Sequence, residues 1–119
     1  MAEIGTVSTF VKPSAKQIIE PSPALKMVED IVGCKWSLTV LSLVRQGICR
    51  PGVMERSVEG LTTKVLNERL RKLTRYNIIQ RRAYPEIPPR VEYSLTVTGE
   101  KFVTILDQFS ELEIEVSTK

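Results

Sequence analysis

The apolar positions from residue 23 onward recur at the spacing of amphipathic helices. A first helix is predicted from Pro23, which follows a serine suited to a helix start, to near Gly33, with its apolar face formed by Leu25, Val28, Ile31 and Val32. A second helix is predicted over residues 35–47, where Gly47 supplies the left-handed turn that ends it. Its apolar residues cover a wide arc, so this helix should be buried on two sides.

Two further helices joined by a glycine turn follow. Residues 50–60 hold a short apolar pattern that Gly60 terminates, and residues 62–76 form a longer amphipathic pattern with Thr62 or Thr63 as its cap. On a helical wheel, Leu70 and Leu73 lie within about 40° of Leu66. The basic residues lie between about 140° and 180° from Leu66, at Lys64, Arg71 and Arg75. This arrangement predicts a helix-turn-helix whose second helix turns its cations outward.

From residue 79 the period changes from that of a helix to that of a strand. Ile79, Arg81 and Ala83 alternate with polar neighbours, and a second alternating run ends near residue 95. Three prolines separate the runs, and proline cannot donate to a strand ladder. A hairpin over about residues 79–95 is therefore predicted, with Arg90 held at its proline-rich tip.

The last apolar pattern predicts a helix that begins at Thr96 or Thr98 and reaches Val116. Its stripe is longer than one small domain needs, and an exposed apolar helix face on a lone chain would be a liability. We therefore expect this stripe to pack on a second copy of the chain. The expected dimerisation residues are Phe102, Ile105, Leu106, Phe109 and Leu112.

Together these elements predict a mainly helical α+β fold. It is a winged helix-turn-helix domain over residues 23–119, with a two- or three-stranded wing and terminal dimerisation helices, preceded by an arm over residues 1–22. The 119 residues and 42% hydrophobic content suit a single domain. No apolar run approaches the ~18 to 20 residues of a membrane span, and the first residues lack a signal-peptide pattern, so a cytoplasmic protein without membrane association is expected.

Charge is distributed unevenly along the chain. Residues 45–90 contain eleven Lys and Arg against four Glu, a net charge of +7, whereas residues 91–119 contain two Lys against six acidic residues. A basic central segment of this kind is typical of proteins that bind a polyanion. Because the basic residues lie on an outward helix face, double-stranded DNA is the expected partner.

The sequence offers little chemistry for catalysis. It contains no histidine and only two cysteines, and it has no cofactor motif, so no enzyme activity, cofactor or metal is expected. Cys34 precedes a lysine that could lower its pKa, which leaves two interpretations open: a redox-active thiol or a small buried side chain. Trp36, at the head of a buried helix, is expected to be a core or dimer anchor.

Three strings carry a resemblance to a known family. "GCKWSLTVLSLV" over residues 33–44, "LTTKVLNERLRKL" over residues 61–73 and "YPEIPPRVEYSLTVTGE" over residues 84–100 resemble the HxlR-type winged helix transcriptional regulators of bacteria and archaea. The resemblance spans most of residues 23–112, with Cys34 in place of the second glycine of the family's Gly-Gly-Lys-Trp stretch. It implies a homodimer on a pseudopalindromic operator, with the recognition helix in the major groove and the wing on backbone or minor groove.

The resemblance also bears on sensing. Some members of the family sense oxidants through a cysteine that precedes a proline just before the first helix. Ser22 and Pro23 stand near that position here, so that switch is not carried over. A small-molecule effector could bind between the terminal helices, although nothing in the sequence names it. The operator, the genes controlled and the sign of regulation are likewise not encoded in these patterns.

Individual roles can be assigned on the predicted recognition helix. Thr62, Thr63, Lys64 and Asn67, in its first turn, are the candidates for base edges, and Arg71, Lys72 and Arg75 are candidates for phosphates. Glu68 could accept from a cytosine amino group, and Arg90 could meet DNA from the wing. The alternatives are a solvated charged face or a winged helix module that docks an acidic protein, which would retain no duplex in a gel shift.

Overall fold

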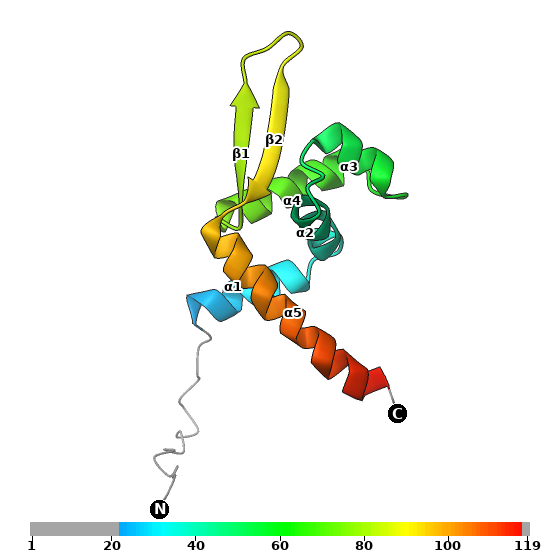
Figure 1. The fold of residues 1–119 in the computed structure, drawn as a ribbon, viewed down its shortest axis with the longest axis vertical. Coiled ribbons are helices and arrows are strands. Elements are labelled where there is room, and N and C mark those ends of the chain that lie inside the picture. Colours follow the sequence, from blue (N-terminus) through cyan, green and yellow to red (C-terminus); the bar gives the residue numbers. More distant parts are fainter. Residues whose placement is uncertain (1–21, 118–119) are drawn as a thin grey trace, which may run out of the picture.

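The computed structural model describes residues 22–117 and arranges them as a helical body with one projecting hairpin (Figure 1). The elements, in chain order, are α1 (Pro23–Val32), α2 (Ser37–Arg45), α3 (Pro51–Ser57), α4 (Thr63–Arg75), β1 (Ile79–Tyr84), β2 (Arg90–Leu95) and α5 (Val97–Ser117). The predicted mainly helical α+β winged helix-turn-helix fold is thus confirmed. All but the last residue of the predicted arm lies outside the described residues.

Side-chain caps fix where three of the helices begin. Ser22 Oγ accepts from the amide of Leu25 at 3.2 Å, and Thr62 Oγ1 accepts from the amide of Val65 at 3.2 Å. Thr96 Oγ1 accepts from the amide of Gly99 at 2.9 Å. Each cap satisfies a backbone donor that the first turn of a helix leaves without an internal partner. Of the two threonines expected at each start, the structure selects Thr62 for α4 and Thr96 for α5.

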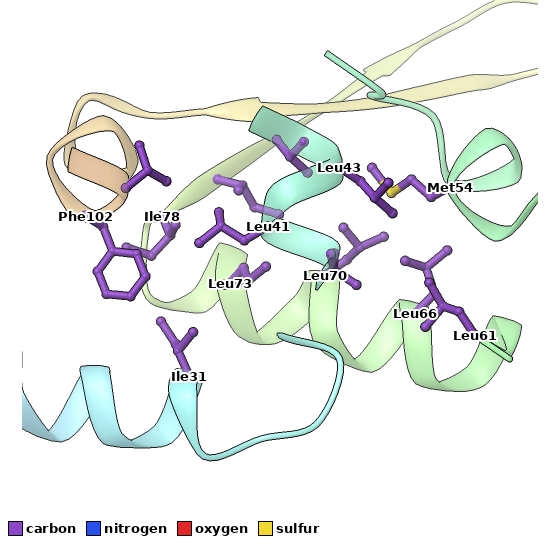
Figure 2. Close-up of a cluster of buried hydrophobic side chains, with 14 residues drawn as sticks. Ile31, Leu41, Leu43, Met54, Leu61, Leu66, Leu70, Leu73, Ile78 and Phe102 are labelled. Atoms are coloured by element: carbon purple, nitrogen blue, oxygen red, sulfur yellow. The ribbon is translucent and has the colours of Figure 1, made fainter. Parts of the chain in front are cut away.

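The core lies between α4, α2 and the first turns of α5, with α1 beneath them (Figure 2). Leu66, Leu70 and Leu73 of α4 are at most 1% exposed, as the helical wheel predicted. Ile31 of α1 and Phe102 of α5 reach the same cluster. Burial of a large aliphatic side chain contributes roughly 1.5–3 kcal/mol, so this leucine face anchors α4 firmly from behind.

The start of α5 is seated on the turn between α4 and β1. Thr96 Oγ1 donates to the carbonyl of Asn77 at 2.6 Å, and the Thr96 amide donates to the carbonyl of Ile78 at 3.1 Å. A Cβ added at Gly99 would lie 2.0 Å from that Ile78 oxygen, so only glycine permits this approach. The close contact sets the direction in which α5 leaves the body (Figure 1).

The hairpin is a two-stranded antiparallel sheet whose register runs from Ile79 opposite Leu95 to Tyr84 opposite Arg90. Successive side chains point to opposite faces, so the register sorts them into two sets. One face carries Arg81 beside its cross-strand partner Tyr93, and the other carries Arg82, Tyr84, Arg90 and Glu92. The hairpin stands clear of the helices as a wing (Figure 1). No described helix has the length and apolarity needed to cross a membrane.

Candidate nucleic-acid interface

The geometry of α3 and α4 is that of a helix-turn-helix. Gly60, between the two helices, has a φ of 92°, a left-handed conformation that suits glycine. Thr63 Oγ1, in the first turn of α4, donates to Glu55 Oε1 of α3 at 2.8 Å. Leu61 of the turn and Met54 of α3 are buried in the core. The two helices are therefore held together both by packing and by a polar contact.

The outward face of α4 carries the residues that the helical wheel selected. Thr62, Thr63, Lys64, Asn67, Arg71 and Arg75 are all exposed, while the leucines on the opposite face are buried. The Thr62 side chain serves as the helix cap and Thr63 donates to α3, so these two hydroxyls also hold the helix start. Lys64 and Asn67, one turn apart, remain directed away from the core.

Lys72 does not lie on this face. Its ammonium group contacts Asp30 Oδ1 of α1 at 2.6 Å, and the Lys72 side chain is only 15% exposed. The Tyr76 hydroxyl donates to the other carboxylate oxygen of Asp30, also at 2.6 Å. The hydrogen bonds from Lys72 and then Tyr76 lower the pKa of Asp30 below its ordinary value of 3.8. The structure therefore gives Lys72 a role in joining α1 to α4, contrary to its expected contact with phosphate.

Glu68 and Arg69 lie at the edge of the basic face. Arg69 Nε donates to the carbonyl of Lys35 at 2.7 Å, and its Nη1 lies 3.7 Å from Glu68 Oε1. Arg69 is therefore bound within the protein by a backbone carbonyl and by a neighbouring carboxylate. Glu68 is half-buried beside it, and its carboxylate is partly neutralised within the protein.

Arg90 is held inside the wing and does not project freely from its tip. Its guanidinium lies 3.8 Å from the centroid of the Tyr84 ring and bonds Glu86 and Glu92, each at 2.8 Å. Arg50, ahead of α3, also approaches Glu92, at 3.6 Å. With two carboxylates and an aromatic face as neighbours, Arg90 presents little free charge to an outside anion.

A basic hollow between α4 and the wing was not foreseen from the sequence. It has a volume of about 460 Å³ and is lined by Asn67, Arg71, Thr74, Arg75, Arg81 and Tyr93. Thr74, Arg81 and Tyr93 line this hollow but were not among the residues expected at the site. The alternation of β1 already grouped Arg81 with the buried Ile79, but only the packed structure shows that this face turns toward α4.

Most of the exposed large apolar side chains among the described residues lie on α5 and α1, although not at every position expected. Phe102 is 4% exposed and belongs to the core, so its assignment to a dimer surface was wrong. Leu106 is half-buried against the same core. Ile105, Phe109 and Leu112 remain 51–55% exposed, and a groove of about 380 Å³ beside Phe109 runs between α5, α1 and α2.

Cys34 and Trp36 occupy the connection between α1 and α2. Cys34 is a half-buried free cysteine, and its side chain contributes, after Asp30, to raising the pKa of Lys72. Trp36 adopts a positive φ of 76° and packs partly buried against the core, beneath Gly60. This placement confirms the expected packing role of Trp36, whereas the redox interpretation of Cys34 stays a prediction.

These features define a winged helix-turn-helix protein: a capped recognition helix, a preceding short helix, a hairpin wing and a long terminal helix. The chain belongs to the HxlR-like helix-turn-helix family, whose model matches residues 31–118. An HTH-type transcriptional regulator of Synechocystis is 44% identical over 82 residues, which are 69% of this chain and 61% of that protein. An HTH-type transcriptional regulator of Methanothermobacter thermautotrophicus is 39% identical over 88 residues, which are 74% of this chain and 67% of that protein.

Solved structures of two regulators have a similar fold. A protein from Enterococcus faecalis, described as a MarR-family transcriptional regulator, superposes with a TM-score of 0.73 at 26% identity, over 88% of this chain and 96% of that one. The redox regulator HypR in its oxidised form superposes with a TM-score of 0.61 at 27% identity, over 77% and 95% of the two chains. All four proteins are named as regulators, and the family of this chain is one of helix-turn-helix regulators and not of enzymes.

Proposed function

We propose that this chain is a homodimeric, sequence-specific DNA-binding transcriptional regulator. The observation that carries the proposal is the outward face of α4, where Lys64, Asn67, Arg71 and Arg75 are exposed opposite a fully buried leucine face. A helix with its side chains is about as wide as the major groove of B-DNA, so this face can be inserted into the groove. Membership of a helix-turn-helix family whose relatives are transcriptional regulators supports the same function.

The residues of α4 divide into two roles in this proposal. The first turn of a recognition helix reaches the base edges, which assigns sequence readout to Thr62, Thr63, Lys64 and Asn67. Glu68 stays a candidate for a cytosine contact at the edge of this surface. Arg71 and Arg75, farther along the helix, meet phosphates, which position the protein without reading sequence. Lys72 is excluded from the interface because Asp30 holds its ammonium group.

The dimer is formed by the apolar surface of α5. Ile105, Phe109 and Leu112 expose about half of their surface, and the groove beside them is lined almost entirely by apolar side chains of α1, α2 and α5. Burying these residues against a second copy removes apolar area from water, which is the main driving force for association. The dimer would place two copies of α4 in successive major grooves about 34 Å apart on a pseudopalindromic operator.

Selection of bound duplexes from a random pool, using the purified full chain, tests the function and returns the half-site spacing. Lys64→Ala and Asn67→Ala should then relax the sequence preference, whereas Arg75→Ala should weaken selected and random duplexes by the same factor. Binding should fall steeply as salt rises, because phosphate contacts release counterions. A chain that retains no duplex even at low ionic strength would instead support docking of an acidic protein on the same face.

A further inference from the structure

We propose that the basic hollow between α4 and the wing is a binding site for one phosphodiester group of the DNA backbone, with Arg71, Arg75 and Arg81 as its ligands. The inference rests on the proposed function and deepens it, because it names a wing residue and a phosphate contact that the helix-turn-helix alone does not specify. It also assigns the wing's contact to Arg81, on the face of the hairpin that turns toward α4, and not to Arg90.

Many cations of the basic central segment, residues 45–90, already have a partner within the protein. Several arginines and lysines of this segment are bound by partners within the protein: Arg45 by Asp107, Arg50 by Glu92, Arg69 by Glu68 and by the backbone carbonyl of Lys35, Lys72 by Asp30, and Arg90 by Glu86 and Glu92. Within residues 22–117, no carboxylate forms an ion pair with Arg71, Arg75 or Arg81. The charges left for an external anion therefore include all three arginines of the hollow.

Arg71, Arg75 and Arg81 converge on the same hollow. Arg71 and Arg75 lie one turn apart on the same face of α4, and Arg81 enters the hollow from β1. Three guanidinium groups around one concavity repel one another, and this repulsion is relieved when an anion binds between them. A guanidinium offers several donors in a planar fork that matches the oxygens of a phosphate group. The hollow therefore has the charge and the donors that a phosphodiester requires.

The wing side of the hollow is held rigidly by packing and by a backbone hydrogen bond. Arg81 lies directly opposite Tyr93 in the hairpin register, and Tyr93 is half-buried against the core. The Tyr93 amide donates to the carbonyl of Cys49 at 2.9 Å, which ties β2 to the segment between α2 and α3. The backbone that carries Arg81 is therefore fixed relative to α4, so less ordering is needed when the anion binds.

The position of the hollow beside the outward face of α4 indicates that the bound phosphate belongs to DNA. Asn67 lies both on the outward face of α4 and on the wall of the hollow. A phosphate held by the three arginines would therefore adjoin the bases that the first turn of α4 reads. One strand of the duplex would pass between α4 and the wing, which is where a backbone must run if both elements contact the same DNA.

Neighbouring arginines of β1 provide a matched test. Arg82 carries the same charge one residue away, but it lies on the opposite face of the hairpin, 5.1 Å from the Tyr84 ring. For the full chain, affinity for a selected duplex is measured against salt concentration in the wild type, Arg81→Gln, Arg81→Lys and Arg82→Gln. Complete loss of one phosphate contact reduces the slope of log affinity against log salt by about 0.9 per protomer, which is the upper limit for a change at one of the three arginines. We expect a reduction within that limit for Arg81→Gln, because Arg71 and Arg75 remain at the phosphate, and no reduction for Arg82→Gln, with Arg81→Lys intermediate in affinity.

Neutral linkages locate the contact on the DNA. Methylphosphonate groups replace single phosphates along the selected duplex, and the loss of affinity is measured for the wild type and for Arg81→Gln. One position in each half-site should weaken wild-type binding, and the same substitution should weaken Arg81→Gln by a smaller factor, because part of that contact is already lost. Thermal melting of the variants should match the wild type, since the exposed Arg81 has no ion-pair partner among the described residues.

The outcomes separate this inference from the proposed function. If the wild type binds duplex steeply with salt but Arg81→Gln keeps the wild-type slope, the phosphate site is wrong and the DNA-binding function stands. If Arg82→Gln loses as much of the slope as Arg81→Gln, the contact comes from general positive charge, and the site is again wrong. If the wild type binds no duplex, the proposed function itself fails.

Discussion

Two phenylalanines on α5 should respond in opposite ways to the same truncation. Phe102 and Phe109 lie two turns apart on one helix, yet Phe102 is 4% exposed in the core and Phe109 is 53% exposed beside an apolar groove. If the exposed stripe is a dimer surface, Phe102→Ala should reduce the stability of each protomer, whereas Phe109→Ala should reduce association. The pair separates folding from assembly without changing the kind of residue removed.

The magnitudes follow from burial. Truncating a buried phenylalanine to alanine costs about 3–5 kcal/mol, a large share of the ~5–15 kcal/mol that stabilises a typical domain. Phe109 has about half of a side-chain area of roughly 200 Å² left to bury, which corresponds to about 2.5 kcal/mol per protomer at ~25 cal/mol/Å². Two protomers contribute about 5 kcal/mol, so Phe109→Ala should raise the dimer dissociation constant by up to about four-thousandfold.

Sedimentation velocity over a range of concentrations measures the dissociation constant, and thermal melts followed by circular dichroism measure stability. Melts at several concentrations are needed, because a dimer that binds only in the folded state raises its own melting temperature by mass action. Phe109→Ala should be monomeric with a cooperative melt, and Phe102→Ala should melt lower by on the order of 15 °C. A Phe109→Ala protein that dimerises as tightly as the wild type would refute the α5 interface.

Two further changes test the framework that positions α4. Gly99→Ala should gain up to about 1 kcal/mol in helix propensity but lose more from the 2.0 Å approach to the Ile78 carbonyl, so chemical denaturation should show a net loss of about 2 kcal/mol. Asp30→Asn should lower the melting temperature at neutral pH, since it removes the ion pair with Lys72. Because the pKa of Asp30 is lowered when folded, its stabilisation is present above the ordinary value of 3.8 and is lost as the pH falls below it. The difference between wild type and Asp30→Asn should therefore vanish in acid melts, and a constant gap would contradict the ion pair's role.

Helices, caps and the hairpin could be read from the sequence because each depends on local pattern. The leucine spacing of residues 66–73 predicted a buried face that the structure shows as 0–1% exposed, and alternation after residue 79 predicted the wing. Period and cap chemistry are properties of a few adjacent residues, so no tertiary information was needed to place these elements. Tertiary packing decided only details, such as the start of α2 after the left-handed Trp36.

The division of the α5 stripe was not readable from its pattern. Apolar spacing showed one continuous face from Phe102 to Val116, but the seat of Gly99 on Ile78 determines where the helix leaves the body. Residues before that departure, such as Phe102, pack inside, and those after it, such as Phe109, stay exposed. The position of the boundary depends on a backbone contact between segments about twenty residues apart, which no helical wheel contains.

For charge, too, the sequence shows the total but not which residues are already paired within the protein. The net charge of residues 45–90 locates the basic region correctly, yet it counts Lys72 and Arg90 equally with Arg71 and Arg81. Only the fold shows that Asp30 from α1 holds Lys72 and that two glutamates of the wing hold Arg90. A cation already paired inside the protein must give up that partner before it can bind a phosphate, so its net contribution to affinity is small. The salt dependence of DNA binding should therefore follow the number of unpaired cations on α4 and the facing side of the wing, and not the total charge of the segment.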